Sequence, residues 1–516
     1  MPRITASTSV ADILDICPSA RRIFDRYGLK GCGGREGPAE SLSFFARVHQ
    51  VDMEALLKDL NVEVENPSKE DALYKESLAD TIYRRFFKGG IVIVLTVGGL
   101  WGVINLVQIA VRKNLLQPAL VPAIHAHAHA MIFGWVGLFV MGFAYQSFPR
   151  FKYTTLWRPG LANLTFFLML LGIGARAGAE MLQPRPVGIG LGALSAIAEF
   201  IAIGLFLLII SKTAGRSLEP HSPYEKFIFG ALAWFLIQAV FSDFFFFAKA
   251  TAGGGSELFQ RIALLDPPLR DIQLFGFAAM IIAGVSQRFV PVVYGLGKPK
   301  HDRQGLIFVL MNGSLILDIF CYVGLYSTGN SYFVAGLEFS YLLMLAWAVL
   351  LVFQLRVFTK TSEPDRSWKF IRAAYVWLII ALGMMPFFIP YSVWTHQFFA
   401  HAYWAAHRHA FTVGFISMMI LGVSSRIVPI LAGVSSRQIS SLWGPFILLN
   451  VGCLGRVVLE VLTDHLPRIA YPLMGTTGFL EITALAWWGI GLWRVMNLSK
   501  TQRTNLLVAP VPVGSK

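Results

Sequence analysis

The sequence predicts an all-α, polytopic membrane protein with twelve transmembrane helices in three four-helix repeats, preceded by a small cytosolic helical domain. Apolar residues make up 55% of the 516 residues and charged residues only 14%, a composition too apolar for a water-soluble domain. Apolar runs of about 20 residues, each long enough to cross about 30 Å of hydrocarbon as a helix, occur twelve times. One pattern of glycine and proline recurs about every 140 residues, which is far longer than a solenoid repeat.

The recurring pattern is a glycine, a second glycine eight residues later and a proline seven residues after that. It occurs three times, as Gly134, Gly142 and Pro149, as Gly276, Gly284 and Pro291, and as Gly414, Gly422 and Pro429. An ionisable residue follows each proline after 27 positions, and another polar residue comes four positions later: Arg176 and Glu180, Asp318 and Tyr322, Arg456 and Glu460. Because these residues have the same spacing in all three segments, the sequence indicates three copies of one four-helix unit. The spans are predicted to start near residues 90, 129, 161, 187, 227, 270, 306, 332, 373, 409, 442 and 469.

Lysine and arginine are unevenly distributed between the predicted loops. If the N-terminus is cytoplasmic, the inside loops hold 15 of these residues and the outside loops hold 8. The positive-inside rule therefore predicts that both termini face the cytoplasm of a bacterial-type inner membrane, with the lipid bilayer as the main partner. Because this asymmetry accounts for the net charge of +14, no nucleic-acid partner is expected.

Four regions are expected along the chain: a small helical domain over 1–62, a polar linker over 63–88, the membrane domain over 89–498 and a cytosolic tail over 499–516. In the first region Cys32 stands in a glycine-rich turn ahead of a predicted helix start. Unpaired backbone amides and nearby cationic side chains can lower a thiol pKa. We therefore expect Cys32 to react faster than Cys17, and a turn cysteine without a role is the alternative.

The run SVADILDICPSARRIFDRYGLKGCGG, residues 9–34, resembles the small helical domain that opens ScdA-type iron-sulfur cluster repair proteins. This resemblance implies a cytosolic module connected with iron or nitrosative-stress chemistry. The metal-binding residues of the second domain of the repair proteins have no counterpart in this chain.

Seven of the eleven histidines fall in two short segments, His125, His127 and His129 before and at span two, and His396, His401, His407 and His409 at the start of span ten. The two segments are equivalent ends of the first and third repeats, on the predicted external side. Neutral imidazole binds haem iron, copper or zinc, and two histidines on different helices can hold a low-spin haem. Alternate residues on a helix point about 200° apart, so one segment cannot supply all its histidines to one metal. Ordinary polar roles remain the alternative.

Two segments carry a resemblance that covers nearly the whole membrane part: HAMIFGWVGLFVMGFAYQSFP in span two and HRHAFTVGFISMMILGVSSRIVP in span ten. They resemble the NnrS family, membrane haem proteins of nitric-oxide metabolism, and the layout is similar to subunit I of the haem-copper oxidases. The resemblance implies a b-type haem with His129 and His409 as axial ligands and His407 as the ligand of a second haem or metal. His127 is a further cofactor-binding candidate, and His125 and His401 are candidate metal ligands, with copper as a candidate metal.

The chain departs from the oxidases on spans six and seven, where those enzymes take copper ligands from histidines. This chain has Asp271 and Gln273 on span six and no histidine over 306–325. A dinuclear haem-copper centre is therefore not expected, and whether the chain is an enzyme stays open. Nitric oxide is the expected ligand, and an electron-transfer protein or a quinol is a candidate partner. The alternatives are an oxidase-like nitric-oxide reductase or other redox subunit, a transporter, and a signalling protein.

Several ionisable residues are predicted inside the membrane. Arg176 with Glu180 and Arg456 with Glu460 are separated by four positions, so each pair shares a helix face. The remaining members of this set lie on fourth helices or three residues before the repeat prolines: Glu199, Glu338, Glu481, Arg288 and Arg426. Such groups either fix helix register or serve haem propionates or proton movement.

Overall fold

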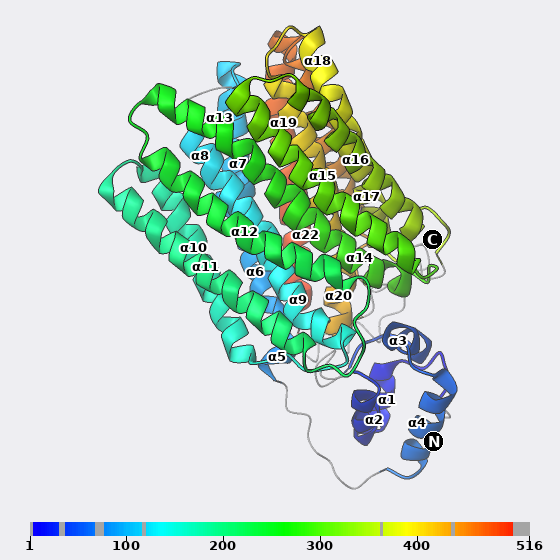
Figure 1. Cartoon of the computed structure of the whole chain (residues 1–516). Coiled ribbons are helices and arrows are strands. Elements are labelled where there is room, and N and C mark those ends of the chain that lie inside the picture. The colour runs from blue at the N-terminus through cyan, green and yellow to red at the C-terminus, as the bar shows by residue number, and fades with distance from the viewer. Residues whose placement is uncertain are drawn as a thin grey trace.

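The computed structural model describes residues 4–29, 37–67, 77–115, 120–361, 365–434 and 439–498. All regular elements of these residues are helices, and they form no strand. The predicted all-α class is therefore confirmed. The chain divides into a small N-terminal bundle, called here the head, and a long bundle of mainly apolar helices (Figure 1).

The head consists of four helices: α1 (Val10–Ile16), α2 (Arg21–Arg26), α3 (Leu42–His49) and α4 (Met53–Glu65). Three of them begin at a side-chain cap, in which Ser9, Ser41 and Asp52 accept hydrogen bonds from backbone amides three residues on. Such caps satisfy amides that a helix start leaves without partners. Helix α4 continues beyond the predicted boundary at 62.

The long bundle contains the following helices, the shorter of which join neighbours into longer segments: α5 (Leu78–Thr81), α6 (Tyr83–Ile93), α7 (Gly99–Arg112), α8 (Val121–His129), α9 (Leu138–Phe151), α10 (Pro159–Leu182), α11 (Pro186–Ala214), α12 (Glu225–Ala250), α13 (Gly255–Asp271), α14 (Met280–Val293), α15 (His301–Thr328), α16 (Tyr332–Leu355), α17 (Trp368–Met384), α18 (Phe388–Trp394), α19 (His401–His409), α20 (Met418–Leu431), α21 (Trp443–Leu462) and α22 (Pro467–Met496). In the described residues they form eleven helical segments that are long and apolar enough to cross a membrane. A polytopic membrane protein is thus confirmed. Helix α22 packs along α21 and α7 but is not among the eleven, so the count of twelve stays a prediction.

Three of the eleven segments form the interior of the bundle. In residues 121–151, 255–293 and 401–431, 78% of the most apolar stretch is buried, against 33–44% in the other eight. These three are the second spans of the three repeats, and they carry the glycine and proline pattern. The repeat therefore places three equivalent helices at the centre and the remaining helices around them.

The glycines of the pattern mark the places where each inner helix touches the first helix of its own repeat. A Cβ at Gly134 would lie 2.5 Å from Ile93, one at Gly276 would lie 2.9 Å from Trp234, and one at Gly414 would lie 2.5 Å from Trp377. The second glycines make the same approach, Gly142 to Phe86, Gly284 to Phe227 and Gly422 to Ile371. Small residues allow helices in a membrane to approach closely, which is why the spacing recurs.

Each inner segment also contains a π-helical stretch at the same place: η5 (Ala130–Gly137), η6 (Ile272–Ala279) and η8 (Ala410–Ser417). The three are offset by 142 and 138 residues, as the glycines are. They directly follow His129, Asp271 and His409. π-Helical turns are rare and are frequently found at functional sites.

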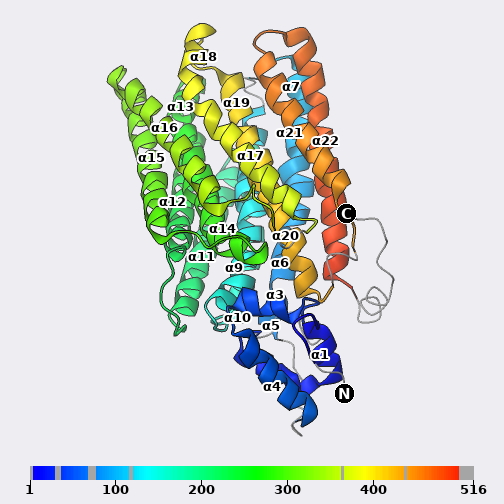
Figure 2. The same cartoon turned by 90° about the vertical axis from the view of Figure 1, so that its right-hand side faces the viewer.

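The head lies against one end of the bundle, and the helices that carry the histidines start at the opposite end (Figures 1 and 2). We call these the head end and the histidine end. Arg47 Nε donates to the carbonyl of Val292 at 3.1 Å, and Arg288 Nη2 donates to the carbonyl of Val48 at 3.2 Å. Arg426 Nη1 lies 3.5 Å from Glu40 Oε1. The side of the membrane that each end faces stays a prediction.

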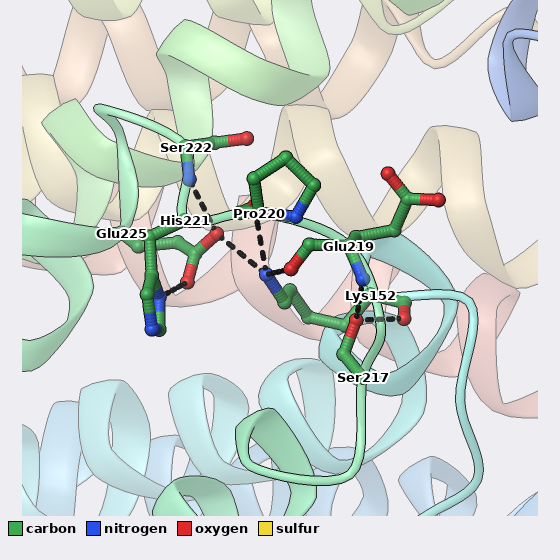
Figure 3. Close-up of polar contacts among 7 residues, drawn as sticks. All are labelled: Lys152, Ser217, Glu219, Pro220, His221, Ser222 and Glu225. Carbon is green, nitrogen blue, oxygen red and sulfur yellow. Dashed lines mark hydrogen bonds and ion pairs between the residues drawn. The ribbon is translucent and has the colours of Figure 1, made fainter.

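At the head end, the loop between α11 and α12 is tied to the end of α9 (Figure 3). Lys152 Nζ donates to Glu225 Oε1 at 3.0 Å and to the carbonyls of Glu219 and Pro220 at 3.2 Å. The Lys152 residue is 2% exposed. Ser222 N and His221 Nδ1 complete the contacts of the Glu225 carboxylate at 2.8 and 2.9 Å. A buried lysine is thus fully paired within this loop.

Candidate functional site

A cavity of about 420 Å³ lies towards the histidine end, between α7, α8, α13, α19, α21 and α22 and the π segments that follow three of them. This volume is in the range of small-molecule and cofactor sites, about 300–1,000 Å³. The wall is mainly apolar, and its titratable or amide side chains are Asn105, His125, His127, His401, His409, Asp266, Arg270, Gln273, Arg408, Arg456, Glu460 and Glu481.

His127 lies on the cavity wall with one ring nitrogen held by the backbone. Its Nδ1 is 2.8 Å from the carbonyl oxygen of Gly98, and its Nε2 makes no hydrogen bond with any described residue. Since the carbonyl can only accept, Nδ1 carries the proton and Nε2 is left with a free lone pair. A ligand histidine typically has this arrangement, in which the second ring nitrogen donates to a carbonyl or carboxylate.

His409 lies on the same wall and is similarly held. Its Nδ1 is 3.0 Å from the carbonyl oxygen of Ala405 and 3.2 Å from Glu460 Oε2. The other oxygen of Glu460 accepts from Arg456 Nη2 at 2.8 Å, so the carboxylate joins a histidine and an arginine of the wall. The side chain of His409 is 33% exposed, and its Nε2 has no hydrogen-bond partner in the described part of the chain.

The structure places His129 elsewhere, because its Nε2 lies 2.8 Å from Glu199 Oε1 and its ring stacks on Phe133. His129 does not line the cavity. His125 does, but both of its ring nitrogens face charged groups, Nδ1 at 2.7 Å from Lys249 Nζ and Nε2 at 3.9 Å from Asp266 Oδ1. The cavity therefore brings His127 together with His409 rather than His129.

His407 is 1% exposed and lies outside the cavity wall, near the rings of Phe275 and Trp404. Its Nδ1 is 3.0 Å from the carbonyl of Ala381, and its buried Nε2 has no hydrogen-bond partner among the described residues. His401 lines the cavity, and its ring lies against Phe399.

The predicted charged pairs differ between the two repeats. Arg456 and Glu460 do contact each other, whereas Arg176 donates to Asp243 and Glu180 accepts from Lys249 at 2.6 Å. Span five therefore supplies the partners of the first pair.

The remaining predicted residues lie away from the cavity. Arg288 and Arg426 contact the head, and Arg426 also lies 3.2 Å from Asp365. Cys32 falls outside the described residues, so its reactivity stays a prediction. Cys17 is buried, with its Sγ 3.2 Å from Ser19 Oγ.

Two arginines of the cavity wall were not among the predicted site residues. Arg270 donates to Asp266 at 3.0 Å and to Gln273 at 2.9 Å, and Arg408 Nη2 lies 3.6 Å from Asp271. The repeat contained the signal, because these arginines occupy equivalent positions 138 residues apart.

Comparison with protein families supplies the identification. A family model described as NnrS protein matches residues 78–498. The chain belongs to the NnrS family. The matched NnrS region contains every helix from α5 to α22 and thus all residues of the cavity wall, whereas the head lies before it. A comparison with curated proteins gave no match. In the described part of this NnrS-family chain, no three His, Cys, Asp or Glu side chains form a group that could hold a metal ion.

Proposed function

We propose that this NnrS-family protein binds a b-type haem in the cavity, that His127 and His409 would hold it, and that the protein acts in the nitric-oxide response. Membership of a family associated with haem supports the cofactor. The observation that carries the ligand assignment is the pairing of each Nδ1 with a protein oxygen, which leaves both Nε2 atoms for iron. His409 is also among the groups close enough to act electrostatically on His127.

The arginines of the wall fit the carboxylates of a haem. Arg456 is 5% exposed, and its Nε and Nη1 have no hydrogen-bond partner among the described residues; the same holds for Nε of Arg408. Leaving a buried donor unpaired is destabilising by about 1–3 kcal/mol, and more for a charged group. Two propionates would pair with these donors in charge-assisted hydrogen bonds.

The haem, when bound, would supply an iron centre for electron transfer or for nitric oxide. The chain would orient it: the carbonyl of Gly98 holds the tautomer of His127, and Glu460 holds the ring of His409 in place. His129 Nε2 could replace His127 Nε2 only by giving up its bond to Glu199. A quinol or an electron-transfer protein remains our proposed source of electrons, and we propose no copper ligand set.

A haem-copper nitric-oxide reductase is the second candidate, and residues of the middle repeat disfavour it. Asp271, at the position of His129 and His409, is 4% exposed and faces Arg408 rather than a histidine. The position two residues earlier is Leu269, which cannot bind a metal.

Haem content tests the proposal. We expect purified wild-type protein to show a Soret band and a b-type pyridine haemochrome, and His127→Ala and His409→Ala to lose most of the haem. His407→Ala is the matched control, because it removes an equivalent, buried histidine outside the cavity. Full haem retention in both ligand variants would contradict the assignment, and loss in His129→Ala but not His127→Ala would restore the original pair.

A further inference from the structure

The three inner helices, with Phe87 of α6 and Ile228 of α12, line a second cavity, of about 90 Å³, nearer the head end. Equivalent residues of the three repeats line it: Val140, Ile282 and Ile420 at one level, and Phe143, Val285 and Val423 at the next turn. Each set is offset by the same 142 and 138 residues as the glycines. The cavity therefore lies on the approximate threefold axis that relates the repeats.

The wall of this axial cavity gives water almost nothing to bind. Two hydroxyl groups line it, and one of them is engaged within the protein, because Ser424 donates to the carbonyl of Ile420. Apolar cavities of this kind stay dry, and a larger one of about 150 Å³ takes up benzene or xenon. A space of about 90 Å³ is smaller than that example and suits a molecule of two atoms.

The axial cavity is close to the histidine cavity. Ser417 lines the histidine cavity, and Met419, two residues further along the same inner segment, lines the axial one. A hydrogen bond of 3.1 Å from Trp135 Nε1 to Ser417 Oγ closes the layer between them. Only two residues along this segment thus separate the linings of the two spaces.

At the other end, the axis is covered by the head. A third cavity, of about 110 Å³, shares Phe151 with the axial cavity and is lined on one side by α3, through Phe44, Phe45, Val48 and His49. Figure 2 shows α3 beneath the ends of α14 and α20. The head therefore closes the axis where the inner helices end.

We propose that the axial cavity is a binding site for a neutral diatomic gas, and that α3 covers its path to the head end. The inference goes beyond the haem proposal, because no haem-ligand candidate lines this cavity. Exchange of gas with the histidine cavity would need only a movement of the Trp135 layer.

Xenon is the probe that tests the site. Crystals of the full chain under xenon pressure are expected to show a xenon atom between α9, α14 and α20. Val285→Phe and Val423→Phe fill the space and are each expected to abolish xenon binding there. Val240→Phe makes the same exchange on the outer face of α12, where Val240 is 52% exposed, and should leave it in place.

The outcomes separate this inference from the haem assignment, because xenon binding requires no iron. His127→Ala without haem should still bind xenon at the axis. Absence of xenon from correctly folded wild-type protein, or its undiminished presence in both filled variants, would overturn the inference. Ala144→Val fills the space less and serves if the phenylalanine variants do not fold.

Discussion

Nδ1 of His127 lies 2.8 Å from the carbonyl oxygen of Gly98. This hydrogen bond joins the second span to the first span at a place where the first span departs from regular α-helix. Gly98 ends a π-helical stretch, η3 (Val94–Gly98), and has ψ of −103°. Because ψ sets the direction of the carbonyl, this oxygen leaves the helical ladder and becomes available to a side chain. His407 and Ala381 make the equivalent bond in the third repeat, but only His127 of the two histidines lines the cavity.

Gly102→Ala should lower haem occupancy although it replaces neither proposed ligand. A Cβ at Gly102 would lie 2.6 Å from Cε1 of His127, so the imidazole must shift from its position. We expect a weaker Soret band per protein. Gly174→Ala, on α10, is the matched control because a Cβ there meets nothing within 4 Å. Equal haem content in the two variants would contradict the position of His127.

Glu460→Gln should destabilise the membrane domain and loosen His409. Glu460 is fully buried and pairs with Arg456 at 2.8 Å, and removing one partner of a buried pair costs about 3–5 kcal/mol. A lower midpoint of thermal unfolding checks this. Asp464→Asn, just beyond the same helix and exposed, should change the midpoint little. Equal decreases of the unfolding midpoint in both variants would show that the Glu460–Arg456 pair stabilises the domain no more than an exposed carboxylate does.

Docking of the head should weaken as pH falls. Burial, followed by the charges of Arg150 and Arg288, lowers the pKa of His49 from 6.5 to about 3. The undocked head exposes His49 and can bind a proton below about pH 6.5, whereas the docked head does so only near pH 3. Between these values the ratio of undocked to docked head therefore rises about tenfold for each unit by which the pH falls.

Limited proteolysis within α3, which contacts the bundle through Arg47 and Val48, can measure this docking when it is followed from pH 7.5 to 4.5. His49→Phe keeps an aromatic ring beside Phe45, which packs 4.3 Å from the imidazole, and removes the titrating group. Cleavage of this variant should be independent of pH over that range. A wild-type cleavage rate that does not rise on acidification would show that His49 stays buried.

Lys152→Met should lower the stability of the bundle at the head end. The substitution leaves the buried Glu225 without its ammonium partner and the carbonyls of Glu219 and Pro220 without a donor. We expect a loss of about 3 kcal/mol, as for other broken buried pairs. His221→Ala removes an 81% exposed partner of the same carboxylate and should cost at most about 1 kcal/mol. Denaturant unfolding of both variants compares the two.

The arrangement of the helices could be predicted because it depends on local composition and on spacing. Apolar length predicts a span from the thickness of the bilayer alone. The spacing of Gly134, Gly142 and Pro149 predicts equivalent inner helices, since each glycine is required where another helix approaches. The π-helical stretches were not predicted, because a π turn gains its stability from contacts around it rather than from its own residues.

Tertiary structure decided which of the histidines faces the cavity. His127 and His129 are chemically identical, and about 200° of helical rotation separates their directions. The side chain that faces the cavity depends on how the inner helix is rotated, which is set by the packing of Gly134 against Ile93. Arg176 likewise pairs with Asp243 rather than Glu180, because the fold brings the Asp243 carboxylate of α12 within reach of its guanidinium group. Sequence determined which residues can do the chemistry, and helix packing decided which of them meet.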